Sequence, residues 1–355
     1  MVSTLDSVNK QQAQQSALAT AAQRKPQLAK ISGVATAVPP GLLTNQDLEK
    51  MVDTTDEWIV TRTGIRQRHI VEKGVTSSDL GAQAAQKLLE QKGLKPTDIE
   101  LIIVATVTPD MMLPATACLI QEKIGATGAW GFDVSIACSG FLYAQQIAVQ
   151  FVANGTHENV LVVGVDIMSS IIDYTDRATC IIFGDGAGAA LVQPSSGVED
   201  GCFLDYIFEI DGSGAQYLRL AGGGSKHPAS HETVDKKMHY VHQDGRTVFK
   251  FATLKMSELC HKLLERNGLT GSDISLFVPH QANRRIIEAA AERIGAPMER
   301  VLVNIDEYGN TTAATLPIAL QTALSQGRLK KGDLVLMAAM GAGFSAGATL
   351  LRWGY

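Results

Sequence analysis

The chain has 355 residues, of which 45% are hydrophobic and 19% charged, a composition typical of one large or two ordinary globular domains and not of a disordered chain. The formal net charge of −5 argues against a general nucleic-acid binder, although local basic clusters can still bind phosphates. No apolar run reaches the roughly 18 residues that indicate a membrane span, so we expect neither nucleic acid nor membrane as a partner.

Residues 1–27 differ in composition from the rest of the chain. They are rich in Gln, Ala and Ser, and they lack the basic start and continuous apolar core of a secretory signal. We therefore expect a mobile or loosely helical extension and a cytoplasmic location. An organellar transit segment, and with it a plastid or other organelle, is the alternative, although Asp6 and the lack of early Arg weigh against it.

From residue 28 onward, predicted strands alternate with predicted helices. The run "LIIVATV" predicts a strand that is apolar on both faces, as expected when both faces are covered. "GFDVSIACSGFLYAQQIAVQFVANGTHENVLVVGVD" predicts strand, turn, helix, turn and strand, and the Gly-rich "FGDGAGAALV" (183–192) predicts a closing strand. This alternation favours an α/β fold of mostly parallel sheets with helices packed on them.

The same order of elements occurs a second time. "KLLEQKGLKPTDIEL" (87–101) matches "KLLERNGLTGSDISL" (262–276) at an offset of 175, and the segment that begins "VLVNIDEYGNTTAATLPIAL" continues the match at an apparent offset of 172. We interpret the chain as a duplication, with one half at 28–200 and the other at 201–355. At the second offset, Cys138 falls on Asn310, so both residues are expected at strand-to-helix junctions.

Three residues at predicted strand ends have the chemistry of a catalytic site, because sites gather at the carboxyl ends of strands in α/β sheets. Cys138 precedes a predicted helix, whose positive end would lower the thiol pKa; the alternative is a small buried filler, which suits the other four cysteines. His280 ends the apolar strand "SLFVPH", where a neutral imidazole can donate a hydrogen bond; the alternative is a structural histidine held by hydrogen bonds. Asn310 precedes a predicted helical run and is the third candidate; the alternative is a helix cap or turn.

Two further sequence features bear on the chemistry. The Gly-rich turn in "AAMGAGFSAGATL" (338–350) offers backbone N–H groups to a developing oxyanion. The five cysteines are widely separated and no Cys/His cluster has zinc-like spacing, so we expect reduced thiols, no disulfide framework, no metal and no cofactor.

The chain resembles the β-ketoacyl-acyl-carrier-protein synthase III family, the thiolase-fold condensing enzymes that initiate type II fatty acid synthesis. The resemblance runs from about Leu28 to the C-terminus and rests on these segments: "DTTDEWIVTRTGIRQRHI" (53–70), "ACSGF" (137–141), "FGDGAGA" (183–189), "HQAN" (280–283) and "GNTTAA" (309–314). It implies a layered αβαβα thiolase-like fold, with the nucleophilic Cys in the first half and His and Asn in the second. It also implies a homodimer.

The resemblance implies an acyltransferase with an acyl-enzyme intermediate. Cys138 would take the acyl group from an acyl-CoA, and malonyl-acyl-carrier protein would then enter. His280 and Asn310 would donate hydrogen bonds to the enolate that forms as CO₂ leaves. The backbone N–H groups of Cys138 and Ala342 would form the oxyanion hole; the family often has Gly at the latter position, and Ala keeps the N–H if its φ is negative.

The resemblance also assigns the substrate contacts. Trp58 and Arg177 would sandwich the adenine of CoA, Arg62 would reach the phosphates, and Asn283 would meet the pantetheine arm near Gly245. The alternative is that Arg62 and Arg177 are ordinary surface residues in contact with water.

A basic surface is implied for the acidic carrier protein. It would consist of Lys250, Arg284 and Arg285. Glu292 precedes Arg293 where some relatives have a basic pair, which predicts a weaker carrier surface.

The acyl pocket is expected to involve Met168, Phe183 and Met340. Leu113 would be inserted at its floor by the dimer partner. Because Leu is slimmer than the Phe of some acetyl-selective relatives, we expect short or branched primers to be tolerated besides acetyl-CoA.

Three other functions fit parts of the pattern. A related synthase that primes a polyketide, a biotin precursor or another specialised product would share the fold and chemistry. A thioester hydrolase would use His280 as a base and would need access for water. A non-catalytic scaffold would tolerate Cys138→Ala.

Overall fold

Two β-sheets form the framework of the computed structural model, which describes residues 26–355. The first sheet has five strands in the order β1-β7-β6-β4-β5. Their bounds are β1 Leu28–Ala37, β4 Leu101–Ala105, β5 Trp130–Val134, β6 Val160–Asp166 and β7 Gly186–Ser195. Every residue of β4 and β6 is buried, as expected for apolar strands whose two faces are both covered.

The second sheet has four strands in the order β11-β12-β13-β8. Their bounds are β8 Cys202–Ile210, β11 Leu276–Pro279, β12 Leu334–Gly341 and β13 Ser345–Arg352. All four β11 residues are buried and all eight β12 residues are buried, so this sheet is also covered on both faces at its centre.

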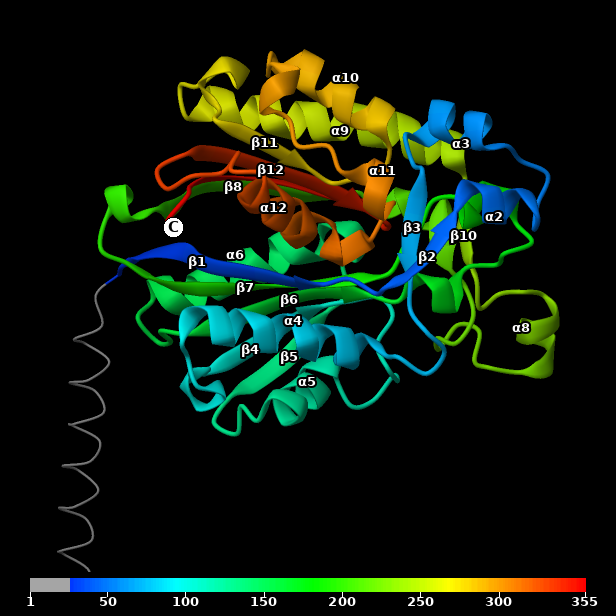
Figure 1. Ribbon diagram of the computed structural model, residues 1–355, viewed down its shortest axis with the longest axis horizontal. Helices are drawn as coiled ribbons and strands as arrows, with labels where there is room; N and C mark the ends of the chain where they lie inside the picture. Colours follow the sequence, from blue (N-terminus) through cyan, green and yellow to red (C-terminus); the bar gives the residue numbers. More distant parts are fainter. Residues whose placement is uncertain (1–25) are drawn as a thin grey trace, which may run out of the picture.

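The long helices form three layers around the two sheets (Figure 1). Helices α6 and α12 lie between the sheets, α4 and α5 cover the outer face of the first sheet, and α9 and α10 cover the outer face of the second. Their bounds are α4 Ser77–Lys92, α5 Thr116–Ile124, α6 Gly140–Ala153, α9 Gly245–Arg266, α10 Arg284–Ile294 and α12 Thr315–Ser325. The predicted αβαβα architecture is therefore confirmed.

Short strands and helices complete the chain. Two-stranded sheets pair β2 with β3 and β9 with β10. The bounds of the strands and short helices are β2 Gly41–Thr44, α2 Asn45–Glu49, α3 Asp56–Thr63, β3 Gln67–Ile70, α7 Arg177–Cys180, β9 Leu218–Leu220, α8 His231–Asp235, β10 Val241–Gln243 and α11 Ile305–Tyr308. The 3-10 helices are η1 Pro96–Asp98, η2 Ala137–Ser139, η3 Met168–Ile171, η4 Val198–Asp200, η5 Gly212–Gln216, η6 Gly271–Asp273, η7 Met298–Arg300 and η8 Thr312–Ala314.

Local sequence signals fix the ends of the repeated helices. Thr76 caps α4 in a capping box with Asp79. The helix ends at Gly93, whose φ of +64° suits glycine, and Gly268, with a φ of +66°, follows α9 in the same way. These are the glycine turns predicted from the two matching segments.

The expectation of mostly parallel sheets is wrong. Among the named strands of the two large sheets, β4–β5, β4–β6 and β11–β12 pair in parallel, whereas β1–β7, β6–β7, β12–β13 and β8–β13 are antiparallel. The Gly-rich strands β7 and β13 cause the difference. Each returns beside the preceding strand of its sheet without a crossover helix that spans the sheet, and such a return gives antiparallel pairing.

The duplication is present, but its offset stays at 175 through the segment where the sequence indicates 172. Leu101 pairs with Val160 in the first sheet, and Leu276 pairs with Val335 in the second. Helices α6 and α12 begin at residues 140 and 315, again 175 apart. The counterpart of Cys138 is thus residue 313, and the predicted equivalence with Asn310 is wrong because it places the second copy three residues out of register.

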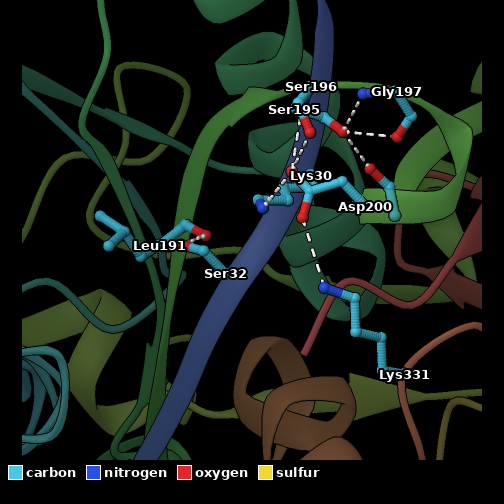
Figure 2. A network of polar contacts seen from close by, with 9 residues as sticks. Lys30, Ser32, Leu191, Ser195, Ser196, Gly197, Asp200 and Lys331 are labelled. Carbon is cyan, nitrogen blue, oxygen red and sulfur yellow. Dashed lines mark hydrogen bonds and ion pairs between the residues drawn. The ribbon is translucent and has the colours of Figure 1, made fainter.

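A polar network joins the strand β1, the turn after β7 and the segment before β12 (Figure 2). The Asp200 carboxylate accepts from Lys30 Nζ at 2.6 Å and from Lys331 Nζ at 3.4 Å, and the Ser196 backbone N–H donates to it at 3.2 Å. The hydrogen bond from the Lys30 ammonium is the main cause that holds the pKa of the Asp200 carboxyl well below its usual range. The network lies at the point where the chain passes from one sheet to the other.

The division of the chain at residues 200 and 201 stays a prediction, with which this topology agrees. The first sheet uses strands between residues 28 and 195, and the second uses strands between 202 and 352. The predicted N-terminal extension lies outside the described residues up to residue 25. Within the described part, no helix is long and apolar enough to cross a membrane.

Candidate active site

Cys138 lies in the 3-10 turn η2, between β5 and α6. Its side chain is buried, with 6% exposed. The small neighbours have a steric reason. A Cβ on Gly140 would lie 3.0 Å from Ala105 Cβ, and one on Gly341 would lie 2.8 Å from the Cys138 backbone nitrogen. Larger residues would therefore displace the backbone that holds the sulfur.

His280 follows the last residue of β11 and is 1% exposed. Its backbone N–H donates to the Ala338 carbonyl at 2.7 Å, which fixes the residue against β12. Burial lowers the pKa of the His280 imidazole to about 3, so the ring is neutral at physiological pH. Its Nδ1 is buried and has no hydrogen-bond partner among the described residues.

Asn310 is held on both sides by backbone hydrogen bonds. Its N–H donates to the Ile182 carbonyl at 3.0 Å, and its carbonyl accepts from the Gly184 N–H at 3.1 Å. Its side-chain Oδ1 accepts from the Thr312 backbone N–H at 3.0 Å. Because a backbone donor faces Oδ1, the amide nitrogen is the atom left to donate elsewhere.

One cavity of about 480 Å³ brings these three residues together. Cys138, His280 and Asn310 all line it. Cys138 and His280 follow the strands β5 and β11, whereas Asn310 follows the short helix α11 and not a strand, so the expectation of a strand-to-helix junction is wrong for Asn310. A thiol, a neutral imidazole and an amide thus line one cavity, although Asn310 is not the counterpart of Cys138.

The expectation of a lowered thiol pKa is wrong. Burial and the nearby Asp166 carboxylate raise the pKa of Cys138 to about 12, while hydrogen bonds from its own backbone N–H and from the Asn310 side chain oppose the rise. Desolvation dominates because the sulfur lies inside the protein and not at an open helix end. The resting side chain is a thiol.

The residues predicted to contact the nucleotide of CoA lie at or beside the same cavity. Trp58 and Arg62 line it, and Arg177 is adjacent to the lining residue Ala178. The guanidinium carbons of Arg177 and Arg62 lie 5.0 and 5.7 Å from the Trp58 ring centre. The predicted pair is therefore in direct contact, and a base stacked between Trp58 and Arg177 would have to separate them.

The two residues predicted to meet the pantetheine arm are also at this cavity. Gly245 and Asn283 both line the cavity. The Asn283 side chain donates to the Arg62 carbonyl at 2.9 Å and accepts from the Arg285 N–H at 2.9 Å, so it links α3 to the start of α10.

Of the residues of the predicted basic surface, Arg285 lines the cavity, whereas Lys250 and Arg284 do not. Lys250, Arg284 and Arg285 are exposed. Arg284 pairs with Glu288 at 2.8 Å, and the Arg285 guanidinium lies 5.4 Å from the Phe249 ring centre. Lys250 forms no ion pair with any residue in the described range 26–355. Arg285 also lines the cavity, so the basic surface and the cavity are continuous.

The expected acyl-pocket residues divide into two groups. Phe183 and Met340 line the cavity, whereas Met168 does not. Met168 is 3% exposed and packs in an apolar cluster that also contains the lining residue Phe183, and its role in the acyl pocket stays a prediction. Leu113 is 85% exposed, as is expected of a side chain that meets a second copy.

Sequence reasoning missed several residues at the cavity. Arg246 and Phe344 line it. Arg246 directly follows Gly245, a predicted CoA contact, and this neighbouring position could have identified it as a cavity residue. Phe344 belongs to the Gly-rich turn that carries Ala342. The φ of Ala342 is not positive, so alanine can replace the glycine of some relatives here and keep its backbone N–H.

Within residues 26–355, no group of three or more His, Cys, Asp or Glu side chains could hold a metal ion. All five cysteines are free.

The chain matches two family descriptions. Residues 132–212 match "3-Oxoacyl-[acyl-carrier-protein (ACP)] synthase III", and residues 264–353 match the C-terminal part of the same family. Cys138 lies in the first match, and His280 and Asn310 lie in the second.

Known proteins are similar over nearly the whole chain. It is 59% identical over 327 residues to the β-ketoacyl-[acyl-carrier-protein] synthase III of Koribacter versatilis, covering 92% of this chain and 98% of the relative. The corresponding protein of Solibacter usitatus is 58% identical over 328 residues, covering 92% and 99%.

Solved structures agree with these relatives. The 3-oxoacyl-[acyl-carrier-protein] synthase III of Aquifex aeolicus has a TM-score of 0.84 at 45% identity and covers 92% of this chain and 100% of its own. The priming β-ketosynthase of the R1128 polyketide pathway has a TM-score of 0.86 at 34% identity, covering 93% and 97%.

Proposed function

The chain belongs to the 3-oxoacyl-[acyl-carrier-protein] synthase III family, and we propose that it condenses an acyl-CoA primer with malonyl-acyl-carrier protein through an acyl-Cys138 intermediate. Membership makes it an acyltransferase-type condensing enzyme that initiates fatty acid synthesis. One observation carries the proposal for the site: Cys138, His280 and Asn310 line one cavity that also reaches Trp58 and Arg62.

In the first half-reaction, the Cys138 sulfur attacks the thioester carbonyl of acyl-CoA. The new C–S bond forms, the bond to the CoA sulfur breaks, and the thiol proton leaves with CoA as its free thiol. A raised thiol pKa fits this sequence, because the thiol keeps its proton until the departing CoA sulfur is present to receive it. The N–H groups of Cys138 and Ala342 donate to the tetrahedral oxyanion.

In the second half-reaction, malonyl-acyl-carrier protein replaces CoA. The bond to the malonyl carboxylate breaks, CO₂ leaves, and the electron pair moves onto the thioester oxygen. His280 and Asn310 donate hydrogen bonds to that oxygen. A neutral imidazole suits a donor, and burial favours the neutral form. The enolate carbon attacks the acyl group, and the Cys138 sulfur leaves and regains a proton from water.

The two substrates use the same mouth. We propose that CoA binds between Trp58 and Arg177, with its phosphates at Arg62. The carrier protein then docks on Lys250, Arg284 and Arg285. The Arg284–Glu288 pair reduces the charge that Arg284 offers, so Lys250 and Arg285 carry more of this role. The substrates are CoA and carrier-protein thioesters, and we propose no resident cofactor.

A second copy of the chain would complete the acyl pocket. The loop after β4 exposes Met112 and Leu113 at 83% and 85%. We propose a cytoplasmic homodimer in which each Leu113 closes the partner's pocket, and a tolerance for short branched primers that follows from its slim side chain. Labelling Cys138 with acetyl-, isobutyryl- and hexanoyl-CoA tests the tolerance by mass spectrometry; strict acetyl labelling would overturn it.

A series of three variants tests the assigned roles. Cys138→Ser should block acylation by acyl-CoA. His280→Ala and Asn310→Ala should keep acylation but lose release of CO₂ from malonyl-acyl-carrier protein, by roughly 100-fold or more for a lost oxyanion donor. Normal condensation by Asn310→Ala would show that its assignment is mistaken, and free acid in place of a 3-oxoacyl product would indicate a hydrolase.

A further inference from the structure

A buried carboxylate links the loop after β4 to the segment that carries Asn310. Asp166 ends β6 and its side chain is fully buried. Its Oδ1 accepts from the Val107 N–H at 2.7 Å, the Thr108 N–H at 3.2 Å, the Thr108 hydroxyl at 3.0 Å and the Thr106 hydroxyl at 3.1 Å. These bonds hold the carboxylate to the first half of the chain.

The other oxygen of the same carboxylate holds η8 in the second half. Asp166 Oδ2 accepts from the Thr312 hydroxyl in a short hydrogen bond, and from the Ala313 N–H at 3.1 Å. Thr312 has a φ of +48°, a left-handed conformation that is rare for a β-branched residue. Such a conformation persists only where surrounding contacts enforce it. Here the Asp166 carboxylate holds both the Thr312 hydroxyl and the Ala313 N–H.

The left-handed turn determines where the Thr312 backbone N–H points. It donates to Asn310 Oδ1 at 3.0 Å. The backbone of Asn310 is already held by Ile182 and Gly184, so the Thr312 bond acts on the side-chain amide alone. With Oδ1 engaged, Nδ2 is the atom of the amide that is left to donate, and the Asn310 side chain makes a hydrogen bond with Cys138 in the shared cavity.

We propose that Asp166 and Thr312 are positioning residues that set the orientation of the Asn310 amide, so that it presents N–H donors to the reacting thioester. The inference rests on the proposed function, because it gives Asn310 its role as a donor. Neither residue lines the cavity. Their effect on the reaction therefore passes through Asn310 and concerns the half-reaction in which Asn310 donates.

The carboxylate is not needed to activate the sulfur. Its charge lies close enough to Cys138 to raise the thiol pKa, which opposes formation of the thiolate. Removing the Asp166–Thr312 contact should consequently spare acylation and impair condensation. A purely structural role would instead lower both half-reactions together with the amount of folded protein.

Thr312→Val and Thr312→Ser form a matched pair for the test. Val keeps the shape and the β-branch but loses the hydroxyl, and Ser keeps the hydroxyl. Thr312→Val should acylate Cys138 within about threefold of wild type and lose about 10-fold or more of the condensation rate, a smaller loss than removal of a donor itself. Thr312→Ser should retain condensation within about threefold, since its hydroxyl still donates to Asp166.

The Asn310→Ala background shows whether the effect passes through Asn310. There, Thr312→Val should reduce the residual condensation by less than about twofold, because residues that act as one unit are not additive. A full additional 10-fold loss in that background, or wild-type condensation by Thr312→Val, would overturn the inference.

A structural readout separates this inference from the proposed function. If the wild type itself does not condense, the proposed function fails, and a crystal structure of Thr312→Val decides the positioning role alone. An Asn310 amide that rotates or loses its bond from residue 312 supports it. An unchanged amide, with the bond from the residue 312 N–H still in place, overturns it.

Discussion

A buried neutral His280 should cause a defined loss of stability in acid. The imidazole is 1% exposed and burial lowers its pKa from 6.5 to about 3, whereas in the unfolded chain it titrates near the ordinary value. Between these pH values the unfolded state binds a proton that the folded state does not, so the free energy of unfolding falls as the pH drops below 6.5. At pH 5 the loss is about 2 kcal/mol, at about 1.4 kcal/mol per pH unit.

The assay compares urea unfolding of the wild type and His280→Asn at pH 8 and at pH 5. Carboxylates that titrate in both proteins cancel in the comparison, provided that the protein concentration is equal throughout. Between the two pH values, the wild type should lose about 2 kcal/mol more than the variant. Equal losses would mean that His280 accepts a proton in the folded protein, which would refute its role as a neutral donor.

Three further predictions address the two substrates and the fold. Trp58→Ala should raise the KM for acyl-CoA about 10-fold, since a stacked base contributes about 1–3 kcal/mol, and leave the KM for malonyl-acyl-carrier protein unchanged; an equal rise in both would contradict adenine stacking. Lys250→Glu should raise the KM for malonyl-acyl-carrier protein about threefold and weaken its salt dependence, and an unaltered salt dependence would exclude Lys250 from the docking surface. Asp200→Asn removes the partner of Lys30, 2.6 Å away, and should lower the Tm while both half-reactions keep their rates; a thermal-shift measurement with no change would show that this network adds nothing measurable.

Features with local signals were predictable from the sequence. The apolar runs gave buried strands such as β4 and β6, and the glycine turns after α4 and α9 lie at Gly93 and Gly268. The candidate residues Cys138, His280 and Asn310 line one cavity, as their chemistry suggested, although only Cys138 and His280 follow strands of the two sheets. Their chemical roles stay predictions.

Features that depend on tertiary contacts were not predictable. The pairing direction of β7 and β13 depends on the path of the connection, which the strand residues do not encode. The offset of the second copy is fixed by backbone conformation, since Ala137 and Thr312, 175 residues apart, both have a left-handed φ. The thiol pKa of Cys138 depends on burial and on Asp166, which lies 28 residues away in the sequence.

The most direct test of the account is a single turnover of pre-acylated enzyme. Protein carrying an isotope-labelled acetyl group on Cys138 is freed of CoA and mixed with malonyl-acyl-carrier protein, and the Cys138 peptide and the carrier protein are followed by mass spectrometry. The account predicts that the label leaves Cys138 at the rate at which labelled 3-oxoacyl-carrier protein and CO₂ form. Release of the label as free acetate, or a label that stays on Cys138 while CO₂ forms, would contradict it.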